Sequence, residues 1–173
     1  MNESILYTIA EVGVTLAGFS GLAVAFRRHD LSSLSPPEFV ALFYLLTNCL
    51  LVVLFSLLPI PLLLWGLSES TIWIVCSPLM AAWFFGGDVV AIHFVRHHPD
   101  EFQWDRAPVW FGNIQWSILA VAAAMGIVLV LSAADLLIPR GQAPYVLGLL
   151  LLLVFSGIEF AYFIIVGRHT GTT

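Results

Sequence analysis

Long apolar stretches alternate with short polar ones along the whole chain. A hydrocarbon core about 30 Å thick is crossed by about 20 helical residues. Five windows reach that length, at residues 5–26, 38–64, 72–95, 109–131 and 145–167. The pattern therefore predicts an all-α fold, a polytopic integral membrane bundle of five transmembrane helices.

Helix-start chemistry marks the breaks between the windows. Ser35 and Glu38 have the spacing of a capping box with prolines between them, and Pro108 and Pro144 stand where later helices should begin. The second window is too long for a straight span. Pro59 and Pro61 near its far end cannot donate backbone hydrogen bonds, so we expect a kink or a helix end there.

Arginine placement predicts the orientation. If the spans alternate in direction, one side receives all arginines except Arg140, namely Arg27, Arg28, Arg96, Arg106 and Arg168. Cytoplasmic loops carry the excess of basic residues. We therefore expect the N-terminus outside and the C-terminus inside, in a bacterial cytoplasmic membrane.

Composition narrows the function classes. The chain is 60% hydrophobic and 10% charged, with a formal net charge of −5 and no lysine. Such a chain has no basic patch for nucleic acid. The longest connection is about 13 residues, which leaves no room for a soluble domain. We expect a single transmembrane domain over residues 1–173, no cofactor, and no enzyme activity.

Three carboxylates fall inside the windows, where an ionised acid at the span centre costs about 2.5 to 3.5 kcal/mol. They are Glu11, Asp88 and Glu159, and no arginine or lysine lies within any of the windows. Intramembrane salt bridges therefore require a terminal arginine to reach inward. The acids must otherwise be protonated, hydrated, hydrogen-bonded or cation-bound.

Depth along each span groups these acids with other polar residues. Counting about 1.5 Å per residue, Asp88 and Glu159 share the inner leaflet with Asn113 and Gln115. The three spans that carry them can build one inner polar cluster.

Glu11 lies about 9 Å below the outer end of its span. Asn48 on the second span is close to this level, so a second, outer cluster can form. Two functions fit the acids. In one, oligomers move cations or protons along the carboxylates; in the other, a non-conducting accessory subunit uses them as interhelical hydrogen-bonding glue.

A stripe of small residues, Gly13, Ala17 and Gly21, recurs every four residues on the first span. This spacing lets helix backbones approach closely, either within one subunit or between subunits. Because the chain is small and its acids lack partners, we expect a homo-oligomer in the lipid bilayer.

Histidines mark the end of the third span. His93 and His97 have the i, i+4 spacing that points two imidazoles from one helix face. A metal site needs further ligands in fixed geometry, so we interpret them as an interface anchor beside Arg96.

Residues 18–29 and 86–97 have the same residue at five of twelve aligned positions. A duplicated helical hairpin or a shared composition can explain this similarity.

Overall fold

The structure is a computed structural model that describes residues 1–27, 36–97 and 109–169. Its helices are α1 (Glu3–Arg27), α2 (Pro36–Leu57), α3 (Pro59–Leu64), α4 (Glu69–His97), α5 (Val109–Ala133) and α6 (Gln142–His169). Five helical segments, with α2 and α3 counted together, are long and apolar enough to cross a membrane. The described part of the chain is all-helical, and the five expected helices are confirmed.

The helix break expected from the prolines is also confirmed. α2 ends at Leu57 and α3 begins at Pro59, with a single turn residue between them. The Leu58 amide still donates to the Leu54 carbonyl at 2.9 Å. A proline nitrogen has no hydrogen to continue this series, so the helix restarts. Pro78 lies inside α4, which continues through it, as membrane-type helices allow.

Helix ends explain why the helices extend beyond the predicted windows. α4 begins three residues before the predicted window because Ser68 caps it, its Oγ accepting from the Thr71 amide at 3.2 Å. α5 ends at Ala133, and two residues later the chain turns at Asp135, which is in the αL conformation (φ 58°) and whose carboxylate accepts from the Arg140 amide at 3.0 Å. Ser35 and Pro108 lie outside the described residues.

The contacts of the chain group it into two compact units. Unit 1 comprises Met1 and Pro59–Gly148, and unit 2 comprises Asn2–Leu58 and Leu149–Thr173. α6 therefore begins in unit 1 and continues in unit 2. Each unit is described by itself below.

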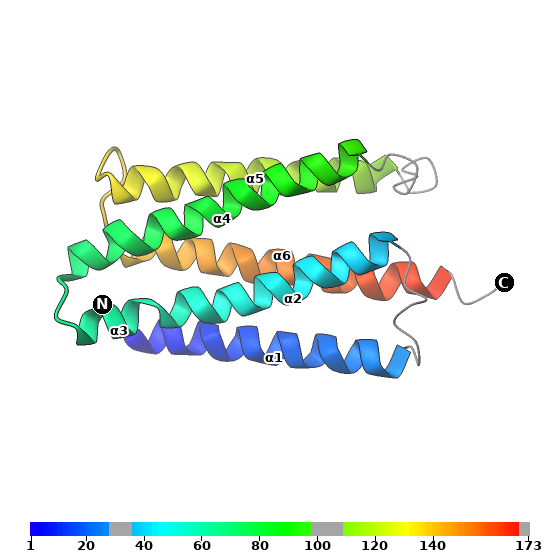
Figure 1. Cartoon of the computed structure of the whole chain (residues 1–173), viewed down its shortest axis with the longest axis horizontal. Coiled ribbons are helices and arrows are strands. Elements are labelled where there is room, and N and C mark those ends of the chain that lie inside the picture. The colour runs from blue at the N-terminus through cyan, green and yellow to red at the C-terminus, as the bar shows by residue number, and fades with distance from the viewer. Residues whose placement is uncertain (28–35, 98–108, 170–173) are drawn as a thin grey trace. The chain divides into compact units, whose positions relative to one another are not determined.

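In unit 1, α4 and α5 pack side by side (Figure 1). Two glycines set how closely these helices approach their neighbours. A Cβ atom at Gly126 would lie 2.8 Å from Cζ of Phe85, and one at Gly148 would lie 2.6 Å from Sδ of Met80. Large side chains therefore fill the space that each glycine leaves. The Trp73 and Tyr145 rings pack 5.3 Å apart between α4 and the first turn of α6.

In unit 2, α1 packs along α2 (Figure 1). The buried residues Leu42, Leu45 and Cys49 of α2 form its core. Leu16 and Ala17 of α1, Leu46 of α2 and Phe160 of α6 pack against that core. Three helices thus share one apolar centre, and α1 contributes only one of its faces.

Candidate functional site

The three carboxylates occupy three different settings. Glu11 is exposed on α1 and Glu159 is half-buried on α6, both in unit 2. Asp88 is half-buried on α4 in unit 1. The structure describes no hydrogen bond or ion pair for any of the three carboxyl groups among the residues it places.

Neutral groups make the described polar contacts inside the helices. The hydroxyls of Thr15, Ser20 and Ser156 each donate to the carbonyl four residues earlier, at 2.7, 2.7 and 2.9 Å. Such i−4 bonds satisfy a hydroxyl without a second helix.

Cysteines supply polar links between helices. The Cys49 thiol of α2 is hydrogen-bonded to Ser156 of α6 in unit 2. The Cys76 thiol of α4 is hydrogen-bonded to Tyr145 of α6 in unit 1. Both cysteines are free and buried. Nothing in the spacing of the two cysteines along the sequence shows which hydroxyl lies opposite each thiol.

Asp88 follows two glycines on α4. A Cβ atom at Gly86 or Gly87 would meet no atom within 4 Å, so space is open beside this acid. Desolvation is the main influence on a carboxyl in such a position, and hydration or a bound cation would relieve it.

The register of α4 against α5 changes the expected inner cluster. Phe85 lies against Gly126, which places Asp88 near the level of Ala123 on the antiparallel neighbour. Gln115 is then about 12 Å further along α5, and Asn113 about 15 Å further, close to the level of His97. The expected common level of Asp88 with Asn113 and Gln115 is not what this register gives. Their side chains lie outside the described residues, although the helix that carries them is described.

Glu11 and Asn48 lie on different surfaces of unit 2. A Cβ atom at Gly13 would lie 3.0 Å from Val52 and 3.4 Å from the Cys49 carbonyl, so the Gly13 face of α1 contacts α2. Glu11 lies on the opposite face and is exposed, whereas Asn48 of α2 is buried. The structure therefore does not bring these two residues together in an outer cluster.

The small-residue stripe divides into two parts. Gly13 contacts α2 directly, and Ala17 packs against the Leu42–Leu45–Cys49 core. A Cβ atom at Gly21 would meet no atom within 4 Å. The stripe thus serves packing within unit 2 over its first two members.

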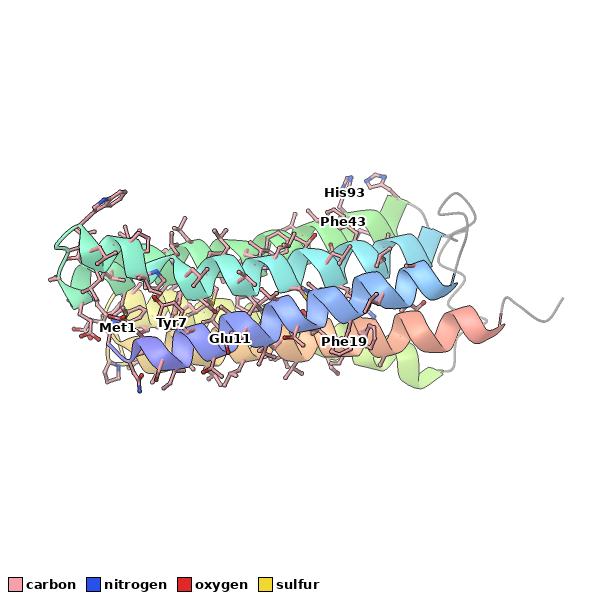
Figure 2. The ribbon with its side chains drawn as sticks, turned by 90° about the horizontal axis from the view of Figure 1, so that it is seen from below. Met1, Tyr7, Glu11, Phe19, Phe43 and His93 are labelled. Atoms are coloured by element: carbon pink, nitrogen blue, oxygen red, sulfur yellow. The ribbon has the colours of Figure 1, made fainter. Side chains whose placement is uncertain are left out.

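The histidine pair lies in the last turns of α4. The His93 and His97 rings are 4.2 Å apart between centroids, and both residues are exposed (Figure 2 shows His93 projecting from its helix). Within the described residues no group of three or more histidine, cysteine, aspartate or glutamate side chains could hold a metal. His98, Asp100 and Glu101 lie outside that part of the chain.

Comparisons of the chain with protein-family models, with curated proteins and with solved structures gave no match.

Proposed function

We propose that this chain is an integral membrane protein whose oligomers move cations or protons along carboxylates of its membrane spans. Its five apolar helices have the length that a bilayer requires. The arginine asymmetry supports an N-terminus outside and a C-terminus inside, in a bacterial cytoplasmic membrane.

One observation carries the proposal: the carboxylates inside the spans have no partner among the described residues. Glu11, Asp88 and Glu159 lie within candidate spans. Thiols and hydroxyls make two polar contacts between helices, Cys49 with Ser156 and Cys76 with Tyr145. An acid within a bilayer span that has no structural partner is best explained by a ligand that binds to it reversibly.

The charged residues of the spans indicate whether that ligand is a cation or an anion. None of the five candidate spans contains arginine or lysine, whereas three of them carry an acid away from their ends, namely Glu11, Asp88 and Glu159. A hydrated path beside carboxylates attracts cations and excludes anions. Protons and small hard cations share this chemistry, because both bind carboxylate oxygen.

The competing function is a non-conducting accessory subunit that docks on another membrane protein. In that function the acids act as hydrogen-bonding glue, and an amide could replace each of them because it also donates and accepts. The described carboxyls make no interhelical hydrogen bond, which favours the conducting function.

The test is cation and proton flux into liposomes that contain the purified protein. Glu11→Gln, Asp88→Asn and Glu159→Gln each remove one intramembrane charge with little change of shape. Each should lower flux by about tenfold or more, equivalent to about 1.4 kcal/mol in the rate-limiting interaction. Glu3→Gln is the matched control, because Glu3 is an exposed acid in the first turn of α1.

The outcomes separate the two functions. Loss of flux in the three variants but not in Glu3→Gln supports conduction. A parent protein with no flux under any ion gradient, copurifying with a stoichiometric partner, would replace conduction by the accessory function. Folded variants whose flux and ion preference equal those of the parent would remove the carboxylates from the pathway.

A further inference from the structure

α1 carries a polar stripe directly opposite the face that packs in unit 2. The buried residues of α1 are Leu6, Ile9, Ala10, Gly13 and Ser20. The exposed stripe consists of Ser4, Thr8, Glu11, Thr15 and Gly18. At about 100° per residue the centres of the two sets are about 180° apart on the helix. The residues of this stripe therefore point away from α2, whereas the polar Ser20 lies on the buried face.

The hydroxyl groups of this stripe present mainly oxygen lone pairs outward. Thr8 Oγ1 donates its hydrogen to the Ser4 carbonyl at 2.9 Å, and Thr15 Oγ1 donates to the Glu11 carbonyl at 2.7 Å. Each hydroxyl has one hydrogen and two acceptor lone pairs. With the hydrogens used inside the helix, the stripe offers acceptor oxygens together with the Glu11 carboxyl.

The surroundings of the stripe are apolar and exposed. Tyr7 and Val14 flank it on one side, and Val12 and Phe19 on the other, with Phe19 60% exposed. Figure 2 shows Tyr7, Glu11 and Phe19 along α1. Apolar flanks suit lipid or another helix. The hydroxyls of Thr8 and Thr15 are satisfied within α1, but hydrocarbon offers no partner to the Glu11 carboxyl between them.

The spacing of the stripe favours another helix as its neighbour. Its members are separated by four, three, four and three residues, the repeat at which two helices remain in contact along a left-handed crossing. Gly18 adds an open position, since a Cβ atom there would meet nothing within 4 Å.

We propose that the polar stripe of α1 is the face at which copies of this chain meet around the cation path, an inference that rests on the proposed function. When Glu11 is ionised, two such rows of acceptor oxygens have no hydrogen to share and cannot hydrogen-bond directly to each other. They are complementary only when a cation, hydronium or water lies between them. Identical stripes around a symmetry axis meet this requirement, because every copy contributes the same oxygens at the same depth.

Within this arrangement Glu11 is the charged cation ligand. Thr8 and Thr15 lie about one turn to either side and contribute neutral oxygens, the ligand set of hard cations. Gly18 lets the backbones approach at the far end of the stripe. The Gly13 face is occupied by α2 in the same chain, so it is not the contact between copies.

Matched glycine substitutions test the interface. Gly18→Leu and Gly21→Leu add the same side chain to α1, and both positions have no atom within 4 Å of a Cβ. Only Gly18 belongs to the stripe; Gly21 lies about 100° from its centre. Gly18→Leu should convert the oligomer to monomer in native mass spectrometry in mild detergent and lower flux at least tenfold. Gly21→Leu should keep the parental oligomer.

Cysteine crosslinking tests the same face without added bulk. In a background with Cys49→Ser and Cys76→Ser, Thr15→Cys and Thr8→Cys place thiols on the stripe, and Val14→Cys places one on its flank. Oxidation by copper phenanthroline in membranes should link copies at positions 8 and 15 and leave position 14 unlinked.

Several results would overturn the inference. These are equal crosslinking at position 14, equal oligomers in the Gly18→Leu and Gly21→Leu variants, or a parent that is only monomeric. A parent that conducts while positions 8 and 15 stay unlinked would refute this interface and leave the proposed function intact. Crosslinked copies without any flux would refute the proposed function and leave the contact between copies.

Discussion

Gly13→Ala should weaken the packing of α1 on α2 in unit 2. The added methyl would lie 3.0 Å from Cγ1 of Val52, 3.2 Å from Cγ2 of Val53 and 3.4 Å from the Cys49 carbonyl. Val52 is fully buried, and β-branched side chains have stiff χ1 rotamers. The two valines can therefore not rotate away cheaply.

The size of the destabilisation by Gly13→Ala follows from a comparison with Gly21→Ala on the same helix. Replacing glycine by alanine favours the helix by about 1 kcal/mol at either position. At Gly21 nothing opposes this gain, because no atom lies within 4 Å of the new methyl. At Gly13 overpacking costs about 1 to 3 kcal/mol. The helix term cancels, so Gly13→Ala should be less stable than Gly21→Ala by about 1 to 3 kcal/mol.

The assay is unfolding by SDS in mixed micelles with dodecylmaltoside, followed by the fluorescence of the six tryptophans. The Gly13→Ala/Val52→Ala double variant should recover about 1 kcal/mol relative to the sum of the single changes, because it returns the occupied space. Equal free energies of unfolding for Gly13→Ala and Gly21→Ala, within about 0.5 kcal/mol, would refute the proposed close contact.

Two further predictions concern the loop before α6 and the topology. Arg140 Nε donates to the Ala133 carbonyl and a terminal guanidinium nitrogen donates to Ser70 Oγ, each at 3.0 Å, so Arg140→Gln should cost about 1 to 2 kcal/mol in the same unfolding assay. Ser70→Ala removes one of these bonds and should cost less; an Arg140→Gln variant as stable as the parent would show that the loop does not depend on them. Alkaline phosphatase fused after residue 173 should be inactive and green fluorescent protein fused there should fluoresce, since both report an inside C-terminus. The reverse pair of results would invert the topology.

The positions of the spans and of the main helix break could be read from the sequence. A bilayer imposes a length and an apolar composition on any helix that crosses it, and both are local properties of the chain. The five windows therefore coincide with the helices to within a few residues. Pro59 fixes the break after α2 for an equally local reason, because it lacks a backbone N–H.

Which face of each helix packs was decided only by the tertiary structure. Soluble helices reveal their buried face by contrast with polar residues, whereas a span that is apolar all around gives little contrast. Gly13 and Gly21 are equivalent in the small-residue pattern, yet only Gly13 has the valines of α2 against it. The register of Phe85 on Gly126 likewise moved Asn113 and Gln115 away from the level of Asp88.

In the candidate site, too, the sequence predicts one part and the tertiary structure determines the other. The position of Glu11 inside a long apolar window is visible in the sequence. Glu11 is exposed because another face of α1 packs against the side chains of α2. Those side chains come from a distant part of the chain, so steric fit across the helix interface, rather than local composition, determines where this carboxylate points.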